Sequence, residues 1–172
     1  HGDGHHGAWH GRGAHQLPAG GRNSRHRAAR DGENCFVLED NGRVIGYIIC
    51  AENFDRFKEI FDSEYLPRSD SYGDDRYEWA STAYNVPEKF KDEYPAHFHI
   101  NILPEYQRMG LGGKLIDTLC AHLADKGIPG VCLTCGPRNE RAMNFYKKYD
   151  FKLLSIDHDD ACFGKKFNLL HL

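Results

Sequence analysis

The sequence predicts a mixed α/β domain, and three features carry this prediction. Residues 34–40 and 43–52 are rich in β-branched and aromatic residues and flank Asn41-Gly42, the strongest short-range signal for a β-hairpin. Residues 96–156 alternate as strand, helix, strand, helix and strand, which is typical of a sheet with a parallel strand pair. The length of 172 residues is sufficient for one hydrophobic core.

The first 31 residues differ in composition from the rest of the chain. They are rich in Gly, His, Arg and Ala, show neither a two-residue nor a 3.6-residue period, and hold six of the eleven histidines. Such a segment buries too little apolar surface to offset the entropy lost on ordering. We therefore expect residues 1–31 to be a disordered tail and residues 32–172 to form the domain.

After the hairpin, the apolar pattern changes to a helical period. Phe54, Phe57, Ile60 and Phe61 recur at this spacing and predict an amphipathic helix within residues 53–66. Residues 66–95 are polar and rich in turn formers, yet they contain the aromatic residues Tyr72, Tyr77, Trp79, Tyr84 and Tyr94. A long connection of this kind is more often a pocket wall or lid than a passive linker.

The second half begins with a strand of strict alternation. In residues 96–103, Phe98, Ile100 and Ile102 face one side, while His97, His99 and Asn101 face the other. The remaining predicted elements are a helix ending near Lys126 before Gly127, a buried strand at 130–135, a helix at 139–149, and strands at 151–156 and 161–167.

Charge and composition argue against several classes of function. The net charge is −3, with an excess of acid after residue 30, which argues against a nucleic-acid partner. No apolar run approaches the ~20 residues of a membrane span, and the N-terminus has no apolar signal segment. The six cysteines are dispersed, and Cys132 and Cys135 have no second pair at zinc-finger spacing. We expect a cytoplasmic protein without a metal, and a homodimer remains open.

The segment ILPEYQRMGLGGKLIDTL, residues 102–119, contains the clearest chemical signal. Three glycines, Gly110, Gly112 and Gly113, stand where an amphipathic helix begins. The first N–H groups of a helix have no intrahelical acceptors and point toward the positive end of its dipole, so they bind anions. Gly110 and Gly112 would let a phosphate approach, and Arg108 could add a charged hydrogen bond. A glycine turn that only fits a tight bend is the alternative.

Two segments together resemble the GNAT acetyltransferase superfamily. INILPEYQRMGLGGKLI is similar to its motif A, Q/R-x-x-G-x-G/A after a strand, with Gln107, Gly110 and Gly112 in the signature positions. NERAMNFYKKYDF is similar to its motif B, which Asn139, Ala142, Phe145, Tyr146 and Phe151 match. The resemblance covers roughly residues 34–168. The phrase PAHFHINILPEYQ looks closest to bacterial relatives of the acetyltransferase-like domain of O-GlcNAcase.

The resemblance implies the fold, the co-substrate and a set of site residues. The fold is a mostly antiparallel central sheet with a splayed parallel pair, and the co-substrate is acetyl-CoA. Its pyrophosphate would lie on the backbone of the signature turn, its pantetheine arm beside Ile100 and Ile102 and at Asn139, and Tyr146 would protonate the leaving thiolate. The implied binding set is Ile100, Ile102, Gln107, Arg108, Met109, Gly110, Leu111, Gly112, Gly113, Asn139, Ala142 and Tyr146. Capping the next helix is the alternative role for Asn139.

The implied reaction is N-acetylation of a primary amine on a small molecule by direct attack. The general base is left open among His97, His99, Glu78 and a water chain. Two departures from the family stand out: Asp150 occupies the usual glycine position of motif B, and the family's first strand and helices are not recognisable before residue 34. A non-catalytic pseudo-acetyltransferase that serves as a binding module is the alternative function.

Overall fold

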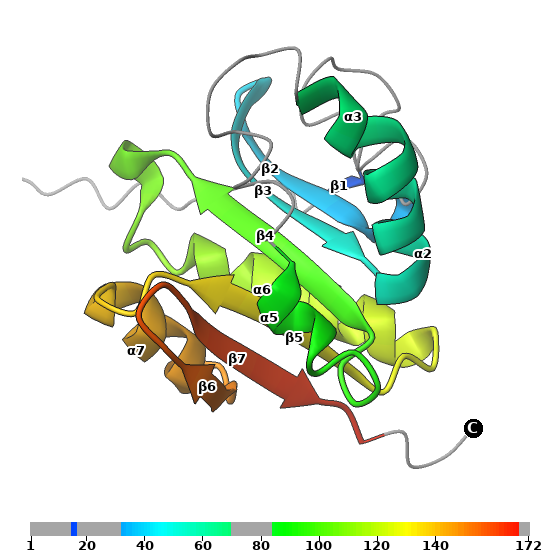
Figure 1. Ribbon diagram of the computed structural model, residues 1–172. Coiled ribbons are helices and arrows are strands. Elements are labelled where there is room, and N and C mark those ends of the chain that lie inside the picture. The colour runs from blue at the N-terminus through cyan, green and yellow to red at the C-terminus, as the bar shows by residue number, and fades with distance from the viewer. Residues whose placement is uncertain (1–14, 17–31, 70–83, 169–172) are drawn as a thin grey trace, which may run out of the picture.

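The computed structural model describes residues 15–16, 32–69 and 84–168, which form a seven-stranded sheet in the order β1-β2-β3-β4-β5-β7-β6 (Figure 1). The strands are β1 (His15–Gln16), β2 (Cys35–Asp40), β3 (Arg43–Ala51), β4 (Ala96–Ile102), β5 (Gly130–Cys135), β6 (Lys152–Ile156) and β7 (Ala161–Lys166). The helical elements are η1 (Gly32–Asn34), α2 (Phe54–Ile60), η2 (Phe61–Tyr65), α3 (Leu66–Ser69), α5 (Asn85–Glu88), η4 (Pro104–Tyr106), α6 (Leu111–Asp125) and α7 (Glu140–Lys148).

The strands and helices expected from the sequence are confirmed, and the structure adds short elements that the sequence did not predict, among them α5 within the connection 66–95. β2 and β3 form the expected hairpin, and its turn residues Asn41 and Gly42 have positive φ of 49° and 82°. The helix expected at 53–66 continues to Ser69 and contains a π-helical turn, η2. The two-residue β1, which lies within the predicted tail, pairs antiparallel with β2. The rest of that tail lies outside the described residues.

The one parallel pair among the described strands is β4 with β5. Its register joins Ala96 to Val131 and His97 to Cys132. On its other edge β4 pairs antiparallel with β3 over six residues, and β5 pairs antiparallel with β7. The sheet is therefore mostly antiparallel with a parallel pair at its centre, as the sequence predicted.

The main core lies between the sheet and helices α6 and α7. The apolar stripe of α6, which contains Leu115, Ile116, Leu119 and Leu123, is fully buried against the strands. Helices α2 and α5 lie on the opposite face of the sheet, where Tyr94 packs against Cys132 and Cys162. No disulfide joins the six cysteines, all of which lie in the described residues, and four of them are buried.

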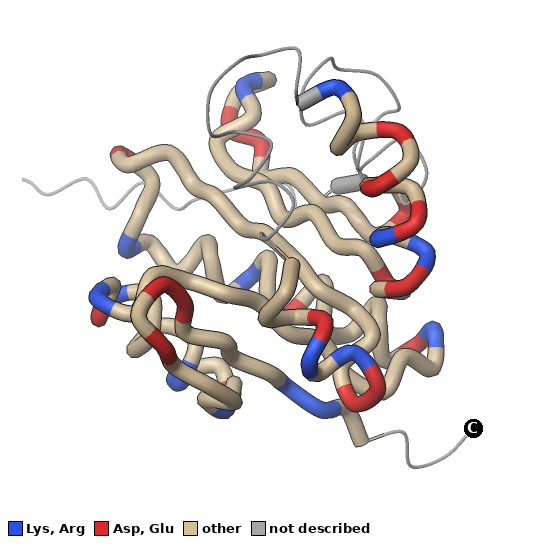
Figure 2. The backbone as a smooth tube through the Cα atoms, in the orientation of Figure 1, with Lys and Arg blue, Asp and Glu red and all other residues tan. Residues whose placement is uncertain are grey.

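Charged side chains stay away from the centre of the sheet. Figure 2 shows Lys, Arg, Asp and Glu on helices, turns and strand ends, while β4 and β5 carry none of them. Within the described parts of the chain, no helix is both long enough and apolar enough to cross a membrane.

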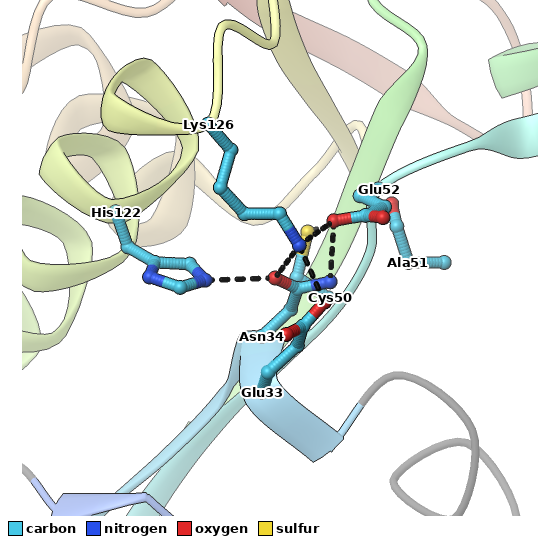
Figure 3. A network of polar contacts seen from close by, with 7 residues as sticks. All are labelled: Glu33, Asn34, Cys50, Ala51, Glu52, His122 and Lys126. Carbon is cyan, nitrogen blue, oxygen red and sulfur yellow. Dashed lines mark hydrogen bonds and ion pairs between the residues drawn. The ribbon is translucent and has the colours of Figure 1, made fainter.

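A polar network joins the end of α6 to the first long strands (Figure 3). Lys126 forms ion pairs with Glu33 at 2.6 Å and with Glu52. Asn34, which is fully buried, donates to Glu52 at 3.0 Å, and its carbonyl oxygen lies 2.9 Å from His122 Nε2. Because the network connects η1 with the ends of β3 and α6, it holds the C-terminal end of α6 against the sheet.

Candidate functional site

The site lies where β4 and β5 separate. Their pairing ends after His97 and Cys132, although both strands continue, and a cavity of about 810 Å³ occupies the space beyond. The cavity is lined by the second half of β4, the turn before α6, the end of β5 and one side of α7. Its volume is in the range of small-molecule and cofactor sites.

The turn between β4 and α6 has an unusual backbone. It passes through η4 and Gln107, then through Arg108 with φ of 65° and Gly110 with φ of 77°. Gly110 is the N-cap of α6 and makes no side-chain capping hydrogen bond. A Cβ added at Gly110 would meet no atom within 4 Å. The left-handed backbone explains this glycine. The first N–H groups of α6 have no acceptor within the helix, and Gly110 and Gly112 beside them line the cavity.

Gln107 connects the two walls of the cavity. Its Nε2 donates to the carbonyl of Ile102 at 2.8 Å, and its Oε1 accepts from Arg141 Nη2 of α7, also at 2.8 Å. The side chain therefore holds the turn against the end of β4 and against α7. Arg141 had no motif signal in the sequence, and only the fold brings it to this turn.

Gly112 and Gly113 serve the packing of α7 against α6. A Cβ on Gly113 would lie 1.8 Å from the Tyr149 hydroxyl oxygen, and one on Gly112 would lie 2.9 Å from Phe145 Cζ. Both distances are shorter than van der Waals contact allows. The sequence suggested either the approach of a ligand or a tight bend as the reason for Gly112, and the structure adds this contact between helices.

Asn139 is the N-cap of α7. Its Oδ1 accepts from the backbone N–H of Ala142 at 3.0 Å, and the residue also lines the cavity. The capping role considered for Asn139 is therefore present, and it is compatible with a hydrogen bond from Nδ2 to a ligand.

Tyr146 lies on the cavity side of α7 and is 8% exposed. Its ring packs edge-to-face against Phe98 and Phe151, with centroid distances of 6.4 and 6.0 Å. Burial raises the pKa of Tyr146, and the nearby Cys135 raises it further. The phenol is therefore protonated throughout the neutral range, so its hydroxyl carries a hydrogen that it can donate in a hydrogen bond.

The candidates for the general base occupy different places. His99 lines the cavity, is exposed, and lies 6.1 Å from the Tyr47 ring, measured between centroids. His97 lies on the same face of β4 as His99 but nearer the start of the strand, where it is buried against Phe57 and Tyr84 at 4.5 and 5.5 Å and does not line the cavity. Glu78 lies outside the described residues.

The predicted aromatic wall is mostly outside the described residues, which include only Tyr84 and Tyr94 of its five members. Tyr84 packs on α2, and Tyr94 packs under β5 and β7. Neither of them lines the cavity.

Most of the predicted binding residues line the same cavity. They are Ile100, Ile102, Gln107, Arg108, Gly110, Gly112, Asn139, Ala142 and Tyr146. Met109 is exposed, Leu111 points into the core, and Gly113 faces Tyr149, so these three do not line it. Lining residues that sequence reasoning missed include Tyr106, Arg141, Lys148 and Tyr149.

Most of the chain matches the model of one known protein family. Residues 10–151 match the family model described as the acetyltransferase (GNAT) family. The chain belongs to the GNAT family. The match begins upstream of the 34–168 region that the sequence motifs indicated, and it includes β1.

Solved structures of the same fold include several acetyltransferases. SsHAT superposes with a TM-score of 0.74 at 24% identity, covering 81% of this chain and 75% of SsHAT. The Thermoplasma acidophilum PaiA N-acetyltransferase, solved with coenzyme A, gives 0.55 at 17% identity over 84% and 69% of the two chains. The Drosophila melanogaster polyamine N-acetyltransferase, which forms N-acetylagmatine, gives 0.57 at 14% identity over 90% and 85%. At these identities the likeness establishes the fold alone.

Proposed function

We propose that this GNAT protein is an N-acetyltransferase that moves an acetyl group from acetyl-CoA to a primary amine of a small molecule. The observation that carries the proposal is the separation of β4 from β5 beside the turn before α6. It creates one cavity that is lined both by the turn at the N-terminus of α6 and by the largely buried Tyr146.

The residues of the cavity fit acetyl-CoA. Its phosphates need N–H donors and cations, and the cavity offers the start of α6 together with Arg108, Arg141 and Lys148. Its pantetheine arm needs an unpaired strand edge, and β4 beyond His97 has no pairing with β5. When bound, acetyl-CoA supplies an activated thioester.

The roles of this chain's own residues follow from their positions. The backbone of β4 at Ile100 would align the arm, and Asn139 Nδ2 would donate to it. Gly110 and Gly112 would let the phosphates approach the backbone, with Arg108 adding a charge-assisted hydrogen bond. The rings of Phe98 and Phe151 pack against Tyr146 and would hold its ring in place. Tyr146 Oη would give its proton to the leaving thiolate.

The amine must attack in its neutral form, so it must lose a proton near the site. His99 is the candidate among the described residues that lines the cavity, and a histidine titrates in the neutral range. A chain of water molecules is the alternative route, and Glu78 stays a candidate. Small amines such as agmatine and polyamines, on which structural neighbours act, are the first acceptors to test.

The alternative is a pseudo-acetyltransferase that binds a ligand without turnover. Calorimetry with acetyl-CoA, followed by turnover assays with a panel of small amines, separates the two. Binding with turnover supports the enzyme, and binding without turnover for any amine supports the binding module. No binding at all would contradict the proposed co-substrate.

Tyr146→Phe tests the mechanism within this proposal. It keeps the ring packing and removes the proton donor, so the affinity for acetyl-CoA should hardly change while turnover falls by about 10²-fold. The loss should shrink with an acyl donor whose thiol is more acidic. Tyr149→Phe is the matched control, because it removes a hydroxyl from the same cavity one helical turn away. Equal rates for Tyr146→Phe and wild type would remove Tyr146 from the mechanism.

A further inference from the structure

The turn that would bind the phosphates is also held by a hydrogen bond to the β2–β3 hairpin, which lies outside the cavity. Tyr106, the last residue of η4, donates its phenolic hydrogen to Asp40 Oδ2 at 3.0 Å. Asp40 is the last residue of β2, at the tip of the β2–β3 hairpin, and lies 66 positions away in the sequence. Tyr106 lies within the segment that resembles motif A but is not one of its signature positions, and Asp40 lies outside both motifs.

The position of Tyr106 in the turn gives this hydrogen bond its importance. Tyr106 directly precedes Gln107, which is fixed to Ile102 and to Arg141. The next residue, Arg108, has φ of 65°, a conformation that a residue with a Cβ rarely adopts. A backbone of this kind persists only where its surroundings hold it in place. Tyr106 and Gln107 supply that restraint immediately before the strained residue.

The contact with Asp40 is well defined on both sides. The ring of Tyr106 packs against the main core and also lines the cavity, so its hydroxyl reaches the hairpin from a fixed ring. Asp40 Oδ1 is engaged by Asn41 Nδ2 at 3.1 Å, which leaves Oδ2 for Tyr106. The hydrogen bond to this carboxylate raises the pKa of the Tyr106 phenol, so the donor proton is present at neutral pH.

We infer that Asp40 and Tyr106 are positioning residues that hold residues 107–113 in the shape required for the phosphates of coenzyme A. The inference rests on the proposed function. It assigns the β2–β3 hairpin a part in binding the co-substrate, although Asp40 does not itself line the cavity. A ligand that needs the same backbone N–H groups would depend on the same contact.

The test combines four variants. Tyr106→Phe removes the donor, and Asp40→Ala removes the acceptor. Asp40→Asn keeps an oxygen that can accept from the tyrosine, so it should rescue the contact. Arg43→Ala is the matched control: it removes an exposed ion pair at 3.4 Å with Glu105, which joins the same hairpin to the same η4. Exposed pairs of this kind contribute little.

Two measurements are made on each variant. Calorimetry with coenzyme A should show about tenfold weaker binding for Tyr106→Phe and Asp40→Ala, the upper end of what a single uncharged hydrogen bond contributes. Asp40→Asn and Arg43→Ala should stay within about twofold of wild type. Hydrogen exchange of the ligand-free protein should speed up at the amides of residues 107–113 in the two weakened variants and stay unchanged in the rest of the sheet.

The outcomes separate this inference from the proposed function. If wild type binds coenzyme A and Tyr106→Phe binds it equally well, the positioning role is wrong and the proposed function stands. Faster exchange throughout the sheet would assign the contact a purely structural role and also overturn the inference. If wild type does not bind coenzyme A, the proposed co-substrate is wrong and the positioning role is lost with it.

Discussion

Replacing Gly113 with alanine should destabilise the protein, although the same change at an open helical position stabilises. In a helix, alanine is favoured over glycine by up to about 1 kcal/mol. Here the added Cβ would lie 1.8 Å from the Tyr149 hydroxyl oxygen, 2.4 Å from Cζ and 2.8 Å from Cε1. The whole edge of the ring must therefore move, because no shift of a single atom relieves three contacts.

The size of the destabilisation follows from the packing contacts that the Tyr149 ring would lose. Its ring packs against Phe145 with centroids 5.0 Å apart, and it is half-buried between α7 and α6. Overpacking a well-packed site costs about 1–3 kcal/mol, and contacts this short favour the upper end. After subtracting the gain in helix propensity, we expect a net loss of about 2 kcal/mol. In a domain of this size that lowers Tm by roughly 4–8 °C.

The assay is thermal and chemical unfolding of a double-mutant cycle. In the Tyr149→Ala background the obstructing ring is absent, so Gly113→Ala should become neutral or stabilising. Gly112→Ala is a graded comparison, since its nearest contact, Phe145 Cζ at 2.9 Å, is less severe. If Gly113→Ala is as stable as wild type, or if Tyr149→Ala does not suppress its effect, the glycine does not serve helix packing.

Two further predictions concern the cavity and the polar network. Gly112→Val should weaken acetyl-CoA binding by about 2 kcal/mol, roughly thirtyfold. It should also lower Tm, because the added Cβ would meet Phe145. If titrations show unchanged affinity, Gly112 serves helix packing alone. Burial raises the pKa of Glu52, but hydrogen bonds from Lys126 and Asn34, with the charge of Lys126, outweigh it and lower the pKa below 4.5. The carboxylate therefore stabilises the fold above its unfolded pKa and ceases to do so as the pH falls through the folded one. The difference in unfolding free energy between wild type and Glu52→Gln should be largest near neutral pH and shrink in acid, whereas a difference independent of pH would refute the assignment.

The fold could be predicted from the sequence because its signals are local or periodic. The hairpin depended on Asn41-Gly42, and both residues have the positive φ that this turn requires. The alternation of β4 separated Phe98, which packs on Tyr146 and Phe151, from His97, which packs on α2. Asp150 occupies the usual glycine position of motif B, and its φ of 65° is the left-handed conformation that favours glycine.

The rest could not be predicted because it depends on contacts across the fold. β1 has two residues, too few for any periodic pattern, and its partner β2 supplies its hydrogen bonds. Arg141 approaches Gln107 only because α7 packs beside the start of α6, and Tyr106 finds Asp40 across 66 positions. Neither pair has a spacing that marks it in the sequence.

The two sequence motifs are coupled through the glycines of the first motif. Gly110 gives the turn its backbone, whereas Gly112 and Gly113 present no side chain to Phe145 and Tyr149 of the helix that follows β5. That close approach brings α7 beside the turn, and α7 carries Arg141 to Gln107 and Tyr146 to the cavity. A bulky residue at Gly113 would therefore displace the proposed proton donor even if the phosphate turn itself stayed intact. The glycine signature of the first motif is thus also a condition for the geometry of the second.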